Sequence, residues 1–503
     1  MNITMLLDMA ADGFGDRVVV GDSQSGLTPG RLRELAASGA REIEEAGADA
    51  LVYLAVNGPA FPVAMFAAAY AGVPLVPVNY RLGREQMDAL LTNHPKALGI
   101  AGPEQSDALR RAGIPVVAPD EWITRLGAAA DSVDEPGLAD NHDSDAPAVI
   151  IYTSGTTSAP KGVLLRHENL SAYVLGSVEF AAADEDEAAL VSVPPYHIAA
   201  VANVVTNLYA GRRTVVLEQF SAEQWLTAAR NEQITSALVV PTMLSRIVGV
   251  DGDKSLPRLR SLAYGGAPMP ARVIESALRT WPDVDFVNAY GLTETSSTIA
   301  VLGPEEHRSA LESSDEAVRA RLGSVGTLIP GVECEIRNDD DEVVGPGVVG
   351  KICVRGDQVS AEYAGVGRMV DERGFFDTRD RGYLDDDGFL FVGGRADDTI
   401  IRGAENIAPA EIEDVVLGHP DVLDVAVVGV PDPEWGQRIE AVVVLRPGVS
   451  LAVDDLRSFV RSALRSSKTP ERIVYWDEIP RSETGKLVRR HVVERLSTQS
   501  TSV

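Results

Sequence analysis

The sequence predicts an α/β fold in which helices cover mostly parallel sheets. Apolar, strand-like runs alternate with helical patterns from about residue 52 to residue 301, which is typical of parallel sheets built from strand–helix–strand units. Between about 323 and 394 the chain carries glycine-rich, short alternating runs, which predict a small antiparallel barrel or meander. A new mixture of helical and strand patterns follows residue 395 and predicts a smaller α+β unit.

The length of 503 residues is more than one hydrophobic core usually serves, so the chain is expected to divide into domains. We expect an N-terminal domain over 1–395 and a C-terminal domain over 396–503. Within the first, α/β subdomains extend to about 322 and a β-rich subdomain covers about 323–395.

Residues 50–80 form a stretch without a charged residue. Gly58 and several prolines interrupt it, so it is better explained as a buried strand, a helix and a second buried strand than as a membrane span. These three elements are predicted at 51–56, 62–70 and 74–78. Further strands are predicted at 148–151, 188–193, 213–217, 236–240 and 261–264.

The later part of the chain predicts shorter strands and a final set of helices. In the β-rich segment, strands are expected at 334–337, 350–354 and 389–392. In the C-terminal domain, we expect helices at 408–417 and 453–466, strands at 422–430 and 438–445, and a basic tail.

The charge balance excludes several classes of protein. The chain has 45 Lys and Arg against 74 Asp and Glu, and its formal net charge is −29. It therefore lacks the basic face that nucleic-acid binding requires. Hydrophobic residues make up 45% of the chain, which excludes a disordered acidic tail. The acidic residues are spread over both predicted domains, as expected of a solubility background.

The cysteines and the N-terminus bear on the compartment. Cys334 and Cys353 cannot form a disulfide framework, have no metal-binding spacing, and indicate a reducing environment. No basic segment precedes Asp8, as a secretory signal would require. We therefore expect a cytoplasmic protein without a membrane span, present as a monomer or homodimer.

A hydroxyl-rich loop follows the predicted strand that ends at Ile151. It reads Thr153-Ser154-Gly155-Thr156-Thr157-Ser158-Ala159-Pro160-Lys161-Gly162. Hydroxyl and backbone N–H groups donate to phosphate oxygens and lysine adds a mobile positive charge, so the loop predicts polyphosphate binding. It is not a P-loop, because Pro160 lacks an N–H and Gly162 stands where Mg²⁺ would need a hydroxyl. The alternative is a polar surface loop.

This loop resembles the phosphate loop of the adenylate-forming superfamily, which includes acyl-CoA synthetases, luciferases and nonribosomal adenylation domains. Ser158 replaces a glycine usual in that family. Five further motifs are similar to the family's, and the chain looks most like bacterial acyl-CoA ligases. They are Tyr264-Gly265-Gly266-Ala267-Pro268, Asn288-Ala289-Tyr290-Gly291-Leu292-Thr293-Glu294-Thr295, Asp377-Thr378-Arg379-Asp380, Gly394-Arg395-Ala396-Asp397-Asp398 and Pro480-Arg481-Ser482-Glu483-Thr484-Gly485-Lys486.

The resemblance implies an ATP site and a magnesium site. Tyr290 would stack on adenine, Thr293 would meet the α-phosphate, and Glu294 would hold Mg²⁺ together with Thr153. The expected nucleotide-binding residues are Thr153, Ser154, Gly155, Thr156, Thr157, Lys161, Gly265, Gly266, Ala267, Asn288, Ala289, Tyr290, Gly291, Asp380 and Arg395.

The later motifs imply a ribose contact, a hinge and a catalytic lysine. Asp380 would accept the ribose hydroxyls, Asp397 would be the pivot of a mobile C-terminal domain, and Lys486 would deliver the adenylating ammonium. Arg379 stands where the family usually has glycine, and it either narrows the nucleotide mouth or extends into solvent.

Lysine is rare in this chain, with 6 Lys against 39 Arg, yet Lys161 and Lys486 occupy motif positions. A compact ammonium can bridge a carboxylate and a phosphate where a rigid guanidinium would fit poorly. Together with Arg395 and the basic stretch 481–495, these lysines are expected to supply the local positive charge that the binding of polyanionic substrates requires.

The segment around His197 resembles the aromatic-His border of the family's acyl pocket, where His197 would gate the pocket. The windows 198–201, 241–244 and 296–299 predict an apolar pocket, and they contain no Lys or Arg, which disfavours dicarboxylates. The expected substrate is a small carboxylic acid with an apolar body.

The resulting interpretation is a ligase that forms acyl-AMP and pyrophosphate from an acid and MgATP, then transfers the acyl group to CoA. Ala404 stands where relatives often have glycine beside the thiol channel, which leaves the acceptor open. The alternatives are an amide synthetase using a small amine and a stand-alone enzyme loading a carrier protein. A non-enzymatic nucleotide sensor would not need Lys486.

Overall fold

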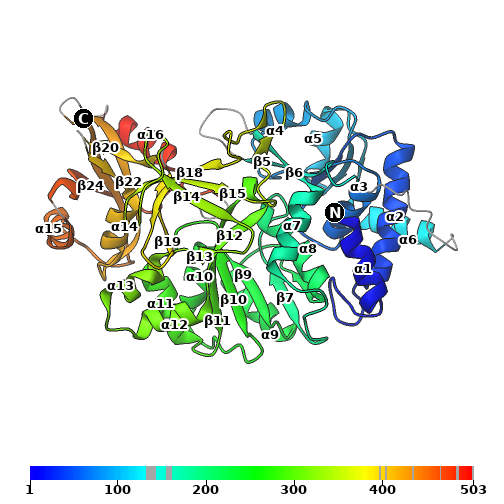
Figure 1. The fold of residues 1–503 in the computed structure, drawn as a ribbon, viewed down its shortest axis with the longest axis horizontal. Coiled ribbons are helices and arrows are strands. Elements are labelled where there is room, and N and C mark those ends of the chain that lie inside the picture. Colours follow the sequence, from blue (N-terminus) through cyan, green and yellow to red (C-terminus); the bar gives the residue numbers. More distant parts are fainter. Residues whose placement is uncertain are drawn as a thin grey trace.

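A computed structural model describes residues 1–131, 143–153, 161–395, 398–402, 405–432, 435–464, 466–482 and 487–500 of the chain (Figure 1). Its elements are arranged around two large sheets, a smaller antiparallel sheet and a C-terminal α+β unit. The α/β fold expected from the alternating apolar runs is confirmed.

The first large sheet has eight strands in the order β17-β16-β6-β5-β2-β1-β3-β4. Strands β5, β2, β1, β3 and β4 run parallel to one another. The pairs β5–β6, β6–β16 and β16–β17 are antiparallel. Their bounds are β1 Leu51–Leu54, β2 Leu75–Pro77, β3 Leu98–Ala101, β4 Val116–Val117, β5 Pro147–Thr153, β6 Lys161–Arg166, β16 Glu362–Tyr363 and β17 Gly367–Arg368.

The second large sheet has seven strands in the order β13-β12-β11-β10-β9-β7-β8. Here β8, β7, β9, β10 and β11 are parallel, β12 pairs antiparallel with β11, and β13 pairs antiparallel with β12. Their bounds are β7 Ala188–Val191, β8 Arg213–Val216, β9 Ser236–Val239, β10 Ser261–Gly265, β11 Asp285–Leu292, β12 Ser297–Leu302 and β13 Thr327–Leu328.

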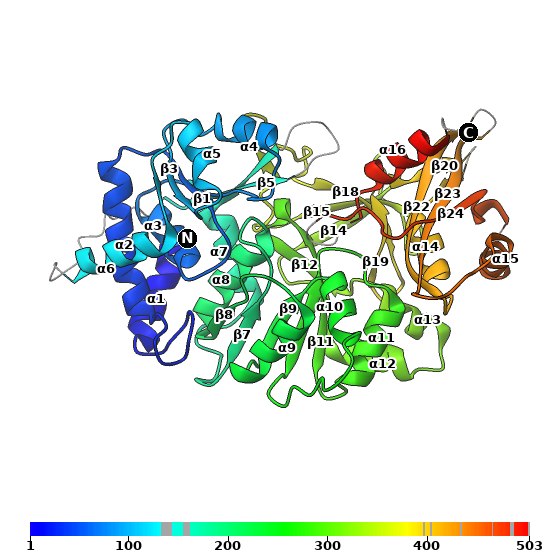
Figure 2. The ribbon, with the colours of Figure 1, turned by 180° about the vertical axis from the view of Figure 1, so that it is seen from behind.

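Helices separate and cover these sheets (Figures 1 and 2). They are α1 Thr4–Phe14, α2 Pro29–Glu45, α3 Ala60–Tyr70, α4 Arg84–Leu91, α5 Ser106–Arg111, α6 Pro119–Ala130, α7 His167–Ser177, α8 Ile198–Ala210, α9 Ala222–Asn231, α10 Pro241–Val248, α11 Ala271–Thr280, α12 Pro304–Glu312 and α13 Glu316–Ala320, with a 3₁₀ turn η1 at Thr293–Thr295. All eleven residues of α3 are buried, which explains why the chain carries no charge there.

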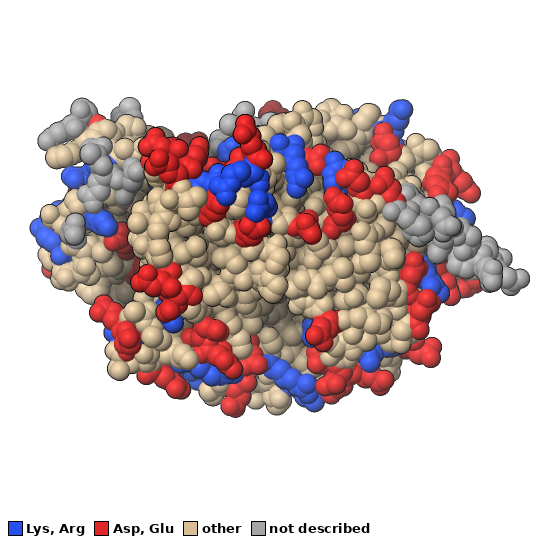
Figure 3. Space-filling model, in the orientation of Figure 1, with Lys and Arg blue, Asp and Glu red and all other residues tan. Residues whose placement is uncertain are grey.

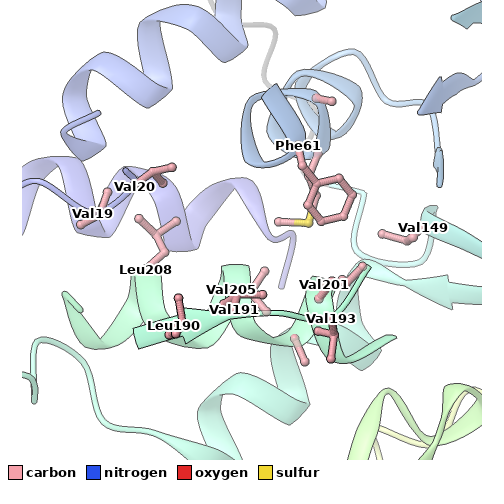
Figure 4. Close-up of a cluster of buried hydrophobic side chains, with 14 of the residues drawn as sticks. Val19, Val20, Phe61, Val149, Leu190, Val191, Val193, Val201, Val205 and Leu208 are labelled. Atoms are coloured by element: carbon pink, nitrogen blue, oxygen red, sulfur yellow. The ribbon is translucent and has the colours of Figure 1, made fainter. Parts of the chain in front are cut away.

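The main hydrophobic core joins the two large sheets. It includes Val149 of β5, Leu190 of β7 and residues of the helices between them. Figure 4 shows Phe61 of α3 facing Val201 and Val205 of α8 across this core. The strand–helix–strand prediction for residues 50–80 is therefore confirmed. In the part of the chain that the structure describes, no helix is long and apolar enough to cross a membrane.

A four-stranded antiparallel sheet, in the order β14-β15-β18-β19, forms the β-rich segment. Its strands are β14 Glu333–Arg337, β15 Gly350–Arg355, β18 Phe376–Leu384 and β19 Leu390–Arg395. One part of this segment behaves differently, because the hairpin of β16 and β17 leaves it and pairs with β6 of the first large sheet. Nothing in the local alternation of apolar and polar residues indicated that this hairpin would pair with a different sheet.

The C-terminal unit is built around β22, β23 and β24, with hydrophobic clusters on both faces. Its elements are β20 Ile400–Arg402, β21 Glu405–Ile407, α14 Pro409–Leu417, β22 Val422–Asp432, β23 Gly436–Leu445, α15 Val453–Ala463, β24 Arg472–Tyr475 and α16 Arg489–Ser500. The helix expected to reach residue 466 ends at Ala463. The division of the chain at residue 396 stays a prediction.

One buried histidine gives the N-terminal region a pH dependence. His167 is 1% exposed and its Nδ1 accepts a hydrogen bond of 3.5 Å from the Ile3 N–H. Burial lowers the pKa of His167 from 6.5 to about 4. The unfolded chain therefore takes up a proton at a higher pH than the folded chain, so the stabilisation present above pH 6.5 falls as the pH drops through that value toward 4.

We expect the His167→Asn variant to show a weaker loss of stability in acid than the parent. Between pH 7.5 and pH 5 the difference should be about 2 kcal/mol in the free energy of unfolding. Urea unfolding followed by tryptophan fluorescence at several pH values measures it, with His491→Asn, at an exposed position on α16, as the control. Parallel pH profiles for the parent and both variants would contradict the assignment.

Candidate active site

The predicted motifs meet at one edge of the second large sheet. The segment containing His197 follows β7, the window 241–244 follows β9, Gly265 ends β10, and Thr293 follows β11. These strands are parallel and adjacent (Figure 1), so their carboxyl ends lie along the same edge. In open α/β sheets this edge is where ligands bind.

Side chains after the parallel strands of the first sheet face the same region. Asn57 follows β1 and donates a hydrogen bond of 3.1 Å from its Nδ2 to the Val193 carbonyl. Tyr80 follows β2, and its ring lies edge-on to that of Tyr196 with 5.3 Å between centroids. These two contacts connect the carboxyl edges of the two sheets.

His197 lies at this junction as the residue before α8. Its ring is 4.6 Å from that of Tyr196, and its backbone N–H donates to the Pro194 carbonyl at 3.2 Å. The Tyr80–Tyr196–His197 row of rings therefore borders the start of α8. This arrangement is consistent with a border role for His197, which stays a prediction.

The predicted phosphate and metal residues come together around β6. Thr153 ends β5 and is paired in register with Lys161, the first residue of β6. The 3₁₀ turn η1, which contains Thr293 and Glu294, packs against β6. The remaining loop residues, Ser154, Gly155, Thr156 and Thr157, lie outside the described residues.

Tyr363 links Lys161 to Glu294 and was missed by the sequence analysis. Its hydroxyl donates a hydrogen bond of 2.8 Å to Glu294 Oε1, and Lys161 Nζ lies 5.8 Å from its ring centroid. Tyr363 belongs to β16 and pairs with Val163 of β6. No spacing in the sequence relates Tyr363 to either partner, since only the sheet pairing brings them together.

Glycines allow a close backbone approach on the predicted adenine side. A Cβ atom on Gly265 would lie 2.2 Å from the Ala289 carbonyl oxygen, and one on Gly291 would lie 1.8 Å from that of Ser297. Gly266 has a φ of +81°, in the left-handed region that favours glycine. Glycine is therefore required at these turns for reasons of space and conformation.

Tyr264 and His307 form a buried hydrogen-bonded pair next to this turn. Tyr264, the residue before Gly265, has its hydroxyl 2.8 Å from His307 Nε2, and His307 Nδ1 lies 2.6 Å from the Gly303 carbonyl oxygen. Burial lowers the pKa of His307. Both contacts are satisfied by a neutral His307 ring that donates a hydrogen bond from Nδ1 and accepts one from the Tyr264 hydroxyl at Nε2.

The predicted adenine and ribose residues are in direct contact. The Tyr290 hydroxyl donates a hydrogen bond of 2.7 Å to Asp380 Oδ2, and Asp380 is 7% exposed. Burial and the neighbouring Asp380 carboxylate raise the pKa of Tyr290 well above its usual value, so the phenol stays protonated. Asn288 and Ala289 lie on the same strand, where the Asn288 amide donates to the Ser324 carbonyl at 3.0 Å.

Arg379 does not narrow this site. The residue is exposed and has a φ of +61°, a conformation that suits the glycine usual in related sequences. Its N–H donates to Asp377 Oδ1 at 2.8 Å, which stabilises the turn. Of the two possibilities, extension into solvent is the one observed.

Several predicted residues lie outside the described residues. These are Lys486, Asp397, Gly403, Ala404 and the side chain of Arg395. The backbone of Arg395 is described, and it pairs with Asp380 between β19 and β18. The predicted ribose contact Asp380 is therefore a neighbour in the sheet of Arg395, which precedes the predicted hinge.

Three arginines of the basic stretch 481–495 are engaged in contacts within the C-terminal unit. Arg481 forms an ion pair of 2.6 Å with Asp424, Arg489 forms one of 2.7 Å with Glu413, and the Arg495 guanidinium lies 4.1 Å from the Trp476 ring centroid. These contacts stabilise the packing of the C-terminal unit.

On the face shown in Figure 3, acidic and basic side chains are interspersed, as expected of a solubility background.

Comparison with known proteins identifies the family. The model of the AMP-binding enzyme family matches residues 7–364, and the model of the AMP-binding enzyme C-terminal domain matches residues 411–486. The chain therefore belongs to the AMP-binding enzyme family, as the motif resemblance implied.

Particular relatives act on different acceptors. The chain is 33% identical to the fatty acid–[acyl-carrier-protein] ligase ScoC of Streptomyces coeruleorubidus, over 89% of this chain and 86% of that protein. It is 31% identical to the indoleacetate–CoA ligase of Aromatoleum aromaticum, over 95% of this chain and 98% of that protein. The solved structure of the amide bond synthetase McbA from Marinactinospora thermotolerans has a TM-score of 0.84 at 27% identity, and the match covers 98% of this chain and 99% of McbA.

We expect the Tyr363→Phe variant to bind ATP about tenfold more weakly in the presence of Mg²⁺, because a hydrogen bond to a charged group is lost. Binding without Mg²⁺ should change little, since the hydroxyl contacts Glu294 and not the predicted nucleotide residues. Titration calorimetry with and without Mg²⁺ measures both affinities.

The control for this variant is Tyr383→Phe. Tyr383 stacks on Phe391 at 4.8 Å between ring centroids, in the four-stranded sheet. Equal weakening with and without Mg²⁺, or no weakening, would contradict the role given to Tyr363.

Proposed function

We propose that this protein activates a carboxylic acid with MgATP to an acyl-adenylate, releases pyrophosphate, and transfers the acyl group to CoA to form a thioester. The observation that carries the proposal is the Tyr290–Asp380 hydrogen bond of 2.7 Å, because it joins two predicted nucleotide residues that are 90 positions apart in the sequence. The cluster of Lys161, Tyr363 and Glu294 lies on the phosphate side of the same edge.

In the first step, a carboxylate oxygen would attack the α-phosphorus in line, and the bond to the pyrophosphate oxygen would break. Positioning and neutralisation of charge account for most catalysis in this kind of chemistry. Thr293 would donate to the α-phosphate, Lys161 would neutralise phosphate charge, and Lys486 would bridge the acid and the phosphate. Lys161 begins β6 and Thr293 begins η1, and these two elements pack against each other.

The residues present fit a magnesium ion that arrives with the nucleotide. Mg²⁺ is usually held by one or two carboxylates together with substrate phosphates and water. Glu294 and Thr153 would supply one carboxylate and one hydroxyl, both next to β6. When bound, the ion would neutralise phosphate charge, while Tyr363 holds the Glu294 carboxylate in place.

The acid would have an apolar body. The pocket border consists of the rings of Tyr80, Tyr196 and His197, and β12 packs against α8 on the side of the 296–299 window. Ser296 is buried and has a φ of +54°, so the backbone turns sharply at the start of this window. The fatty acid and indoleacetate in the names of two relatives are both acids with apolar bodies.

CoA is the acceptor we favour, because a suitable surface borders the predicted thiol channel. Arg402, directly before Gly403, places its guanidinium carbon 4.5 Å from the ring centroid of Trp435. Trp435 is 42% exposed. The Arg402 guanidinium is also paired with Glu471 at 2.7 Å, so the exposed indole is the group that suits a ligand here. It suits the stacking of a base, which CoA offers and a small amine does not.

Two other acceptors remain as alternatives, each with a relative that uses one. Ala404 would add a methyl group beside the thiol channel and would favour a small amine, as in an amide synthetase. A carrier protein would need to dock on a strongly acidic chain, which disfavours an acidic carrier. We place the reaction in the cytoplasm, where the two free thiols Cys334 and Cys353 would stay reduced.

The acceptor is tested by offering a panel of aromatic, fatty and dicarboxylic acids with MgATP, each with CoA, a small amine, or no acceptor. We expect pyrophosphate release with apolar acids and a thioester product only when CoA is present, detected by mass spectrometry. Amide products in place of thioester would select the amide synthetase, and efficient turnover of a dicarboxylate would contradict the pocket argument.

We expect Lys486→Ala to abolish pyrophosphate release from acid plus ATP while acyl-adenylate supplied from outside is still converted to thioester. The reason is that this lysine would act on the attacking carboxylate and phosphate and have no part in the transfer step. The matched control is Lys468→Ala, because Lys468 lies in the same unit and pairs with Glu411 at 2.7 Å. Adenylation at a near-parental rate in Lys486→Ala would overturn the assigned mechanism.

A further inference from the structure

An arginine of the large N-terminal part binds the C-terminal unit. Arg272, the second residue of α11, donates hydrogen bonds of 2.9 Å and 2.5 Å to the backbone carbonyls of Val422 and Leu423. These two carbonyls belong to the first residues of β22. One guanidinium therefore binds residues that lie 150 and 151 positions further along the sequence. It connects α11 to the orange C-terminal elements in Figure 2.

Burial at this contact changes the electrostatics of Arg272. Arg272 is half-buried, and its pKa is lowered by desolvation and by repulsion from Arg446, with Asp424 opposing the shift. The two carbonyls match the rigid fork of a guanidinium, which can donate to both at once. An ammonium lacks this planar pair of donors.

On one side of the contact is the predicted adenine turn. The turn Gly265–Gly266–Ala267 leads through three residues to α11, and α11 begins at Ala271. Arg272 is therefore mounted on the helix that directly follows the base-binding turn. The turn itself is held by the close backbone packing of Gly265 on Ala289 and by the Tyr264–His307 pair.

On the other side is the support of the predicted catalytic lysine. Asp424, the residue after Leu423, binds the Arg481 guanidinium at 2.6 Å and 3.1 Å. Arg481 in turn pairs with Leu487 in an isolated antiparallel bridge. The two ends of the segment that contains Lys486 are thus paired with each other and held on β22.

A second anchor attaches the residues after this segment to the same strand. Arg489 binds both carboxylate oxygens of Glu413 at 2.7 Å and donates to the Val427 carbonyl of β22 at 3.2 Å. Arg481 and Arg489, the described arginines on either side of Lys486, are therefore both attached to β22, and Arg272 fixes the beginning of β22 against α11.

We propose that Arg272 is a positioning residue that holds β22 against α11 and thereby sets the place of the Lys486 segment relative to the adenine turn. The inference rests on the proposed function. It predicts that Arg272 serves the adenylation step and not the transfer step, because the lysine is required in the first alone. An arginine with a purely structural role would affect both steps alike.

The test compares Arg272→Ala with Arg279→Ala in the two half-reactions. Arg279 is the matched control, because it lies on the same helix and pairs with Glu275 at 3.1 Å within α11. The first half-reaction is pyrophosphate release from MgATP and the best acid of the panel. The second is thioester formation from the corresponding acyl-adenylate, prepared chemically, and CoA.

For Arg272→Ala we expect kcat for pyrophosphate release to fall about tenfold, which is the loss of about 1.4 kcal/mol of transition-state stabilisation. KM for ATP and the transfer rate should stay within about twofold of the parent, and Arg272→Lys should fall between the two. An equal fall in both half-reactions, or a rise in KM for ATP with kcat unchanged, would overturn the proposal.

A readout independent of catalysis separates this proposal from the proposed function. Small-angle X-ray scattering should give a larger radius of gyration for Arg272→Ala than for the parent or for Arg279→Ala, because the C-terminal unit is released from α11. An unchanged radius would overturn the positioning role even if the enzyme is active. Absence of pyrophosphate release from the parent with every acid would overturn the proposed function, while the scattering result would still decide whether Arg272 holds the unit.

Discussion

The common direction of the parallel strands is the constraint on which the rest of this structure depends. Because β7, β9, β10 and β11 run the same way, the residues that follow them emerge at one edge, where their backbone groups are not used by the sheet. The first large sheet is placed so that residues after β1 and β2 face that edge too. The rings of Tyr80 and Tyr196 and the hydrogen bond from Asn57 then connect the two edges into one region.

The phosphate side depends on an exchange between sheets. The β16–β17 hairpin comes from the β-rich segment but pairs with β6, and the bidentate contact of Arg166 with Glu362, with both distances at 2.9 Å, holds it there. This pairing brings the Tyr363 hydroxyl to Glu294 and its ring to Lys161. The third sheet, which contributes Asp380, is thereby connected to the phosphate side through the same stretch of chain.

The strong preference for arginine over lysine has a structural explanation in these contacts. Arg166, Arg272 and Arg489 each use two or more donors at once, to a carboxylate or to backbone carbonyls, and an ammonium could not reproduce that geometry. Arginine thus connects segments of an acidic chain that are distant in sequence. Lys161 and Lys486 occupy positions where a mobile point charge next to phosphate is chemically more useful.

Apolar periodicity, glycine-rich turns and hydroxyl-rich loops are local features, and they predicted the fold class, many of the strands, a few of the helices and the motif residues. Tyr290 and Asp380 were named from their motifs, and their contact followed once the sheets were assembled. Only the tertiary structure decided the roles of Tyr363, His307 and Arg272, since each depends on which distant strand or helix becomes its neighbour. It also turned Arg379 outward and committed Arg481 and Arg489 to ion pairs. The physical reason is that sheet order and the packing of one unit against another arise from long-range pairing, which no local pattern of residues encodes.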